Sequence, residues 1–192
     1  MSNRLLTGYV ALICFLMIAP IGIVILTSLN SAAFLSFPPA GYSLKWYGEV
    51  LTDSMWSSSL WLSLKIGFAV AVISTALGVI AALGLRSLNN AASSALQTFF
   101  LSPLMLPTVL IGLALMQFYQ SLGIRASVMT VTMGQMLIAV PYVIRLVLAS
   151  FVGIDPRLER AASILGADSL RVFWYVTFPL IRHAVLAGML FS

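Results

Sequence analysis

The chain has 192 residues, of which 61% are hydrophobic and 8% are charged, whereas roughly 25% of residues are charged in an average soluble domain. Together with a mean hydropathy of +1.07, this excludes an ordinary soluble domain and predicts an integral membrane protein. The net charge of +5 comes from scattered basic residues, which argues against nucleic-acid binding.

Four apolar segments are long enough to cross a bilayer as helices, which takes roughly 20 residues each. We expect these spans at about residues 5–28, 60–85, 95–119 and 126–151. A cleaved signal peptide is the alternative for the first segment, but its apolar run exceeds the usual 7 to 15 residues or so. An uncleaved anchor is therefore favoured.

Two of these spans carry features that bear on packing. Small residues recur at helical spacing in the second span, which predicts close approach of a neighbouring helix; they are Gly67, Ala71, Thr75, Gly78 and Ala82. Prolines are expected to kink the third and fourth spans; they are Pro103, Pro107 and Pro141.

A fifth apolar segment begins at Pro179 and holds 14 residues, which is about 21 Å of helix and too short to cross. We therefore expect the chain to be an incomplete form of a longer protein. The predicted fold is all-α, a polytopic transmembrane helical bundle with four full spans and the start of a fifth. Residues 1–192 are taken as one transmembrane domain.

The basic residues predict the orientation, because cytoplasmic loops are enriched in Lys and Arg. Seven of the ten lie at the amino terminus, after the second span or between residues 145 and 182, and three lie on the opposite side. The amino terminus is therefore expected in the cytoplasm. Residues 29–59 are then extracytoplasmic, with Trp46, Tyr47 and Trp56 suited to the interfacial aromatic belt.

The most charged window, GIDPRLERAASILGADSLRVFWYVTFPLI, covers nearly all of a predicted cytoplasmic loop over residues 152–178 and the start of the fifth apolar segment. Asp155 followed by Pro156 predicts the start of a short helix. Gly166 is suited to the left-handed conformation that ends it, and Asp168 to capping a second helix. The sequence thus predicts two short helices at an angle.

A solvated connector is the alternative for this loop, but inert connections are typically about 2 to 8 residues long. The small side chains of Ala161 and Ala162 would let a partner protein approach the helix backbone, while Arg157, Glu159 and Arg160 stay free for contacts at the rim. A docking element is favoured.

The loop resembles the EAA loop of permease subunits of ATP-binding-cassette importers, whose pattern is E-A-A, three residues, G, nine residues, then I-x-L-P. The matching offsets hold Ala161, Ala162, Gly166, Val176, Phe178 and Pro179. Arg160 occupies the position of the family glutamate and follows Glu159. FPPAGYSLKWYGEVL and MLIAVPYVIRLVLASF resemble the spermidine/putrescine branch, which includes aminoethylphosphonate-type importers.

This resemblance implies a type I importer permease in the bacterial inner membrane. Members normally have six spans, so roughly the last quarter would be absent here. The implied partners are a cytoplasmic ABC ATPase dimer, a second permease subunit and an extracytoplasmic solute-binding protein. The residues expected to couple the chain to the ATPase are Glu159, Arg160, Ala161, Ala162, Gly166, Ala167 and Pro179.

The remaining chemistry argues against other classes. No GxxxxGK[ST] phosphate loop occurs, so ATP hydrolysis is expected in a separate chain and the chain itself is not expected to be an enzyme. The spans hold no Asp or Glu between the charges that bracket them, which disfavours an ion-coupled carrier. A single Cys14 and a single His183 lack partners for a metal site, and no cofactor is expected.

Amide side chains within the spans are candidates for lining a solute path, because they need polar partners or water in lipid. The candidates are Gln117, Gln120 and Gln135, with Thr130 and Thr132 as further possibilities. Interhelical hydrogen bonds that only stabilise packing are the alternative.

The expected function is passage of a polyamine (spermidine or putrescine) or a similar amine. Nothing anionic lines the spans, so either the binding protein selects the solute, which we favour, or the substrate is not a polyamine. The other hypothesis is a non-functional truncated permease that inserts but does not transport.

Overall fold

The computed structural model describes residues 3–34, 36 and 38–192; Phe37, the first residue of the FPPAGYSLKWYGEVL stretch, lies outside them. The described residues form helices, and their only β feature is an isolated bridge between Asn30 and Tyr42. The all-α prediction is thereby confirmed. The chain forms two compact units, Met1–Trp61 and Leu62–Ser192.

The first unit contains α1 (Asn3–Ser28) and α2 (Lys45–Thr52). α1 confirms the first expected span. Asn30, which is buried, organises the loop after it: its amide donates to Ser36 Oγ at 2.8 Å and accepts from the Ala32 N–H at 3.2 Å. The backbone carbonyl of Asn30 accepts a hydrogen bond from Trp46 Nε1 at 2.9 Å. The short helix α2 therefore comes after a loop held by its own hydrogen bonds.

The second expected span is a helix longer than predicted, α3 (Ser54–Ser87). It begins six residues before the expected residue 60 because the Asp53 carboxylate accepts a hydrogen bond from the Met55 N–H at 2.7 Å. A side chain that satisfies a free N–H stabilises the first turn of a helix. Polar residues such as Ser57 and Ser58 are consequently helical.

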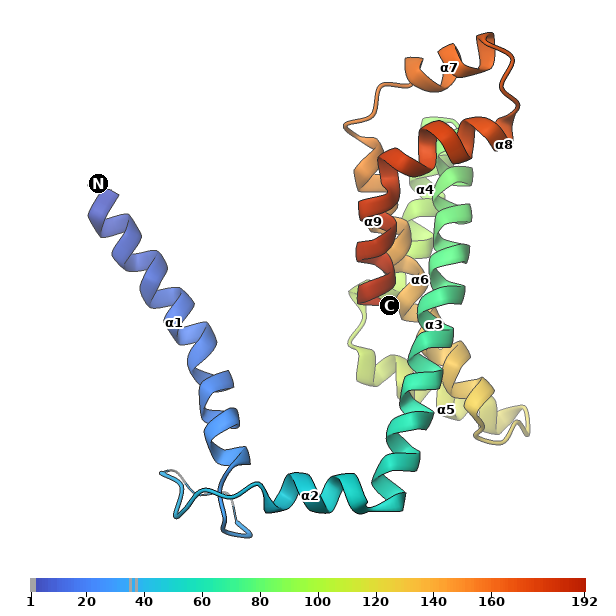
Figure 1. Cartoon of the computed structure of the whole chain (residues 1–192). Helices are drawn as coiled ribbons and strands as arrows, with labels where there is room; N and C mark the ends of the chain where they lie inside the picture. The colour runs from blue at the N-terminus through green and yellow to red at the C-terminus, as the bar shows by residue number, and fades with distance from the viewer. Residues whose placement is uncertain (1–2, 35, 37) are drawn as a thin grey trace. The chain divides into compact units, whose positions relative to one another are not determined.

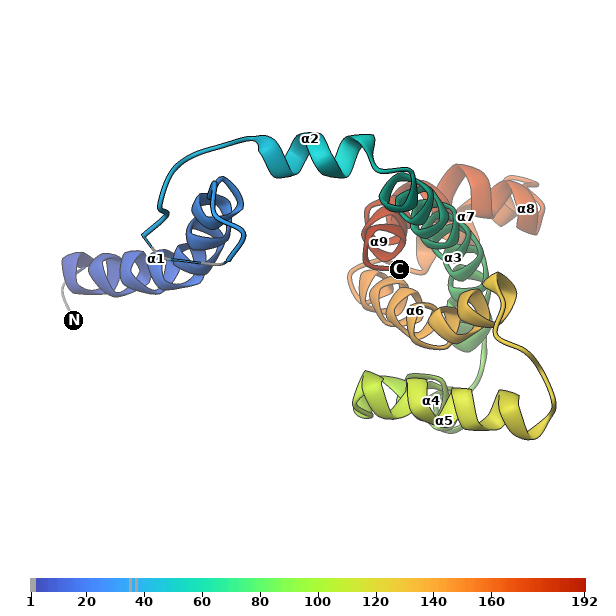
Figure 2. The ribbon, with the colours of Figure 1, turned by 90° about the horizontal axis from the view of Figure 1, so that it is seen from below.

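The core of the second unit lies between α3, α6 (Val128–Phe151) and α9 (Phe178–Phe191), which lie side by side in Figures 1 and 2. Its buried cluster contains Val79, Ala82, Val143, Val147 and Ile181. Val143 of α6 is flanked by Gly78 of α3 and Gly188 of α9, and a Cβ at either glycine would lie within 3.4 Å of the valine side chain. The close approach of a neighbouring helix that the small residues of the second span predicted is therefore present at Gly78, where α6 packs against α3.

The third expected span, over residues 95–119, is bent as its prolines predicted, but it is broken into separate helices. The segment is α4 (Asn90–Leu101), the 3-10 turn η1 (Ser102–Met105) and α5 (Thr108–Ser121), with a bend of 96° between the two halves. Two prolines explain the break: Pro103 is the second residue of the 3-10 turn and Pro107 precedes α5, and neither has an N–H for an α-helical hydrogen bond. Each half alone is shorter than a span.

The fourth span is α6, which begins at Val128 with a reciprocal pair of hydrogen bonds between Ser127 and Thr130. α9 begins at Phe178, next to the expected Pro179, which a first turn tolerates. α8 (Ser169–Val172) and the wide π-helical turn η2 (Phe173–Thr177) precede it without a break. The helical segment Ser169–Phe191 has 23 residues and is long and apolar enough to cross a membrane. The expectation that the fifth apolar segment is a helix of only 14 residues, too short to cross, is therefore wrong.

Candidate functional site

The predicted loop element contains α7 (Arg157–Ile164), which Figure 1 shows beyond the ends of α3, α6 and α9. The Asp155 carboxylate accepts from the Arg157 N–H at 2.9 Å and starts the helix. Gly166 has a φ of +90°, and the Asp168 carboxylate accepts from the Arg171 N–H at 2.8 Å. The predicted helix, glycine turn and second capped helix are therefore confirmed.

The outer surface of this element is apolar and basic. Ile164 and Leu165, directly before Gly166, are 85% and 88% exposed. The side chains of Arg157 and Arg160 are also exposed, and α7 has no buried residue. These two aliphatic side chains give the end of α7 an apolar surface that is open to contact.

Glu159 lies on the opposite side of α7, and the expectation that it is free for rim contacts is wrong. Its Oε1 accepts a hydrogen bond from the Arg86 guanidinium at 2.7 Å and a second from Thr177 Oγ1 at 2.7 Å. Partial burial raises the pKa of Glu159, but the hydrogen bonds from Arg86 and Thr177 and the Arg86 charge outweigh it, so the pKa is lowered from 4.5. Glu159 is therefore ionised at neutral pH.

Arg86 closes this cluster from the end of α3. Its guanidinium carbon lies 4.3 Å from the centre of the Phe151 ring at the end of α6, within the range of a cation–π contact. The Arg86 and Glu159 side chains are 25% and 24% exposed, and Thr177 is buried. We call Arg86, Phe151, Glu159 and Thr177 the polar joint.

Sequence reasoning missed the polar joint because Arg86 and Glu159 are 73 residues apart. A basic residue at the end of a span is read first as an orientation signal, and nothing local in the sequence assigns it a carboxylate partner.

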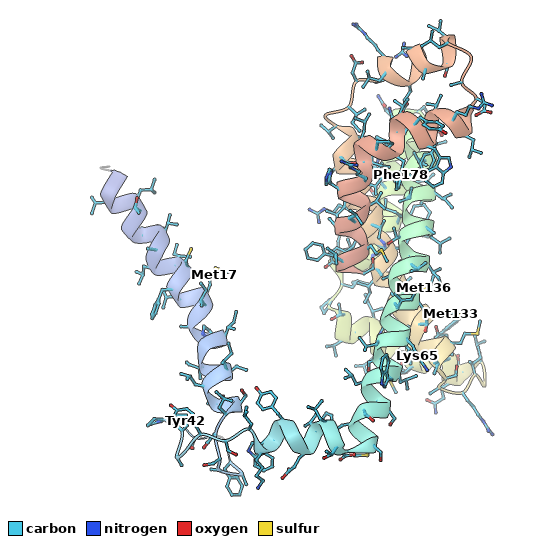
Figure 3. All side chains as sticks on the ribbon, viewed as in Figure 1. Met17, Tyr42, Lys65, Met133, Met136 and Phe178 are labelled. Atoms are coloured by element: carbon cyan, nitrogen blue, oxygen red, sulfur yellow. The ribbon has the colours of Figure 1, made fainter. Side chains whose placement is uncertain are left out.

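The second half of the loop motif forms the wide turn that leads into α9. The Phe178 N–H donates to the carbonyl of Phe173, five residues back, in place of the four of an α-helix. Pro179 has no N–H and cannot restore the α-helical bond one residue later. Figure 3 shows Phe178 at the start of α9, and its ring lies 5.2 Å from that of Trp174.

A second feature is a cavity of about 810 Å³ between α5 and α6. Gln120 and Gln135 line it, as does Thr130, whereas Gln117 does not. Arg125 is the only charged residue among its described lining. No side-chain amide of these three glutamines forms a hydrogen bond to another described residue, so the alternative of an interhelical bond is not found within the described chain.

Comparisons with known proteins place the chain among membrane transport components. The sequence model of the family described as "Binding-protein-dependent transport system inner membrane component" matches residues 74–192, which include the candidate site. The putrescine transport system permease protein PotI of Escherichia coli (strain K12) is 30% identical over 181 residues, covering 91% of this chain and 64% of that protein.

Two further relatives match the whole chain. The spermidine/putrescine transport system permease protein PotC of Escherichia coli (strain K12) is 25% identical over 193 residues, 73% of its length. The putative 2-aminoethylphosphonate transport system permease protein PhnV of Salmonella typhimurium (strain LT2) is 25% identical over 195 residues, also 73% of its length. The chain thus spans about two thirds to three quarters of the length of these relatives.

Proposed function

The chain belongs to the family of binding-protein-dependent transport system inner membrane components, and from this membership we propose that it is the membrane-spanning subunit of an ATP-driven importer for polyamines or similar amines. In this proposal a separate ATPase dimer hydrolyses ATP, a second permease subunit completes the pathway and an extracytoplasmic protein delivers the solute. The residues that we propose to couple the chain to the ATPase are the same as those expected from the loop motif: Glu159, Arg160, Ala161, Ala162, Gly166, Ala167 and Pro179.

The observation that carries the proposal is the exposed end of α7. Ile164 and Leu165 project from a turn that Gly166 holds with a φ of +90°, and these positions coincide with the motif that docks on the ATPase in the family the sequence resembles. Closure of the ATPase would push on this end, and the push would change the arrangement of the spans.

Replacement of Gly166 by arginine tests the docking role. A Cβ at Gly166 meets nothing within 4 Å, so an arginine there fits within the chain but obstructs a partner. Gly123→Arg is the matched control, because Gly123 also has a positive φ, of 70°, and an equally open surrounding. Both variants carry a similar backbone strain of about 1–2 kcal/mol, and only Gly166→Arg alters the proposed docking turn.

The assay is co-purification from membranes with the cognate ATPase, identified among the neighbouring coding regions. We expect the ATPase yield to fall at least tenfold with Gly166→Arg and to stay near the wild-type yield with Gly123→Arg, at equal amounts of inserted permease. Co-purification of Gly166→Arg at the wild-type yield would overturn the docking role.

The polyamine assignment is supported by the names of PotI and PotC. Of the described charged side chains, only Arg125 lines the α5–α6 cavity, and a positive charge does not attract a polyamine. Selection is therefore proposed to lie with the extracytoplasmic binding protein. Uptake of labelled putrescine, spermidine and 2-aminoethylphosphonate by the complete system tests this: uptake of a polyamine is expected, and uptake of the phosphonate alone contradicts it.

We also propose that the amino terminus and the α7 loop are cytoplasmic, on the basis of the charge distribution. In a Cys14→Ser background, a cysteine replacing Ser163 of α7 should resist a membrane-impermeant maleimide added to intact cells. A cysteine replacing Ser43 should react. The reverse pattern would invert the proposed orientation.

A further inference from the structure

Glu159 provides the hydrogen bonds that attach α7 to the helix bundle. α7 has no buried residue, and Leu158 is 49% exposed, so apolar packing holds it weakly. Among the described residues, the side-chain hydrogen bonds that join α7 to the membrane helices and the turn before α9 are those that Glu159 accepts. Apart from the chain itself, which connects α7 to α6 and to α8, a force applied to α7 therefore reaches the bundle largely through this carboxylate.

The two donors to Glu159 belong to different helical segments. Arg86 lies in the last turn of α3, and Thr177 is the last residue of the wide turn that precedes α9. Both donate to the same oxygen, Oε1, at 2.7 Å. Because the Arg86 guanidinium also lies over Phe151 at the end of α6, one carboxylate is connected to the ends of all three core helices.

The contact is strong enough to transmit motion. Exposed ion pairs contribute about 0–1 kcal/mol, but here both charged side chains are about three-quarters buried. Hydrogen bonds at 2.7 Å between ionised groups are short and roughly twice as strong as neutral ones. The helix ends they join continue into a close-packed core around Val143 and Ile181, and such cores transmit displacement with little compression.

We propose that the polar joint is the link through which displacement of α7 moves α3, α6 and α9 together, with Arg86 as the residue that positions Glu159. This inference rests on the proposed coupling function, because it assigns the route by which a push on α7 reaches the spans. Docking of the ATPase on the outer face of α7 and transmission through its inner face are then separate properties of one short helix.

The first test measures the link in the permease alone. In the Cys14→Ser background, spin labels at Ser163→Cys in α7 and Ser87→Cys at the end of α3 report the distance between the two elements in nanodiscs. We expect a narrow distribution of label-to-label distances in the otherwise unmodified chain. Glu159→Gln or Arg86→Ala should increase the width of this distribution at least twofold. Arg160→Gln is the matched control, because its exposed side chain takes no part in the joint. An unchanged distribution in Glu159→Gln would overturn the inference whether or not the proposed function holds.

The second test separates docking from transmission in the complete transporter. Glu159→Gln should co-purify with the ATPase at the wild-type yield, while solute transported per ATP hydrolysed falls at least tenfold. Arg86→Lys keeps the charge but loses the planar fork, so its coupling should be intermediate. The exchange Arg86→Glu with Glu159→Arg should recover part of the loss.

The outcomes distinguish the two proposals. Loss of ATPase co-purification in Glu159→Gln would assign Glu159 to docking and overturn the transmission role. Wild-type coupling in Glu159→Gln would overturn it as well. Failure of the unmodified chain to bind any ATPase would instead refute the proposed function, while the spin-label distances would still decide whether α7 and α3 are linked.

Discussion

Replacement of Gly78 by alanine should force α3 and α6 apart. The added Cβ would lie 2.5 Å from Val143 Cβ and 2.6 Å from its Cγ1, and 3.3 Å from the carbonyl oxygen of Val140. Rotation of the valine side chain cannot relieve the first contact, because a Cβ atom is fixed by the backbone. The two helices must separate by about 1 Å to restore an ordinary carbon–carbon distance of about 3.5 Å.

Overpacking of this kind costs about 1–3 kcal/mol, which corresponds to roughly a 5- to 150-fold shift in the folding equilibrium. Gly84→Ala is the matched control, because Gly84 lies in the same helix and a Cβ there meets nothing within 4 Å. That variant should be neutral or more stable by up to about 1 kcal/mol, because alanine favours a helix over glycine.

Reversible unfolding by SDS in mixed micelles, followed by circular dichroism, measures both variants. Val143→Gly in the Gly78→Ala background removes the side chain that clashes, so the double variant should be less destabilised than the sum of the single ones by about 1–2 kcal/mol. Equal stability of Gly78→Ala and Gly84→Ala, or strict additivity with Val143→Gly, would refute the proposed contact.

Three further predictions concern the loop and the cavity. The pKa of folded Glu159 is lowered from 4.5, so its ionised form stabilises the fold above that value, and this stabilisation is lost as the pH falls through the folded pKa. The distribution of distances between the spin labels at Ser163→Cys and Ser87→Cys should therefore keep the same width from about pH 6 to about pH 8. It should broaden only as the pH falls below 4.5. Asp168→Ala removes the cap of α8, so amide exchange of its first turn should accelerate by a factor of about 5, equivalent to about 1 kcal/mol. Gln120→Leu and Gln135→Leu should reduce uptake, whereas Gln117→Leu, outside the cavity lining, should not.

Local signals in the sequence predicted most of the elements. The apolar runs that became α1, α3 and α6 are long and hold only Lys65 and Arg145 as charged residues within the expected spans. The caps at Asp155 and Asp168 act within three residues along the chain. The glycine at 166 is likewise a local requirement, since its φ of +90° is costly for other residues. Such features depend on near neighbours and are therefore visible in a single sequence.

Features that depend on contacts between distant segments were not predicted. The prolines at 103 and 107 indicated a kink, but the 96° bend depends on how the two halves are placed. The pairing of Arg86 with Glu159 joins two helix ends that come together only when α3, α6 and α9 pack. Gln117 could not be distinguished from Gln120 because the cavity is formed by two helices.

The turn from Phe173 to Thr177 fixes the angular phase of α9. Each residue of an α-helix advances about 100° around the axis, so a turn that accommodates an additional residue absorbs that rotation locally. Ile181 and Gly188 consequently face α6, while Thr177 still reaches the carboxylate on α7. Deleting one residue within this turn would tighten it to the regular pitch of an α-helix. Either Ile181 and Gly188 would then rotate away from α6, or Thr177 would rotate away from the Glu159 carboxylate.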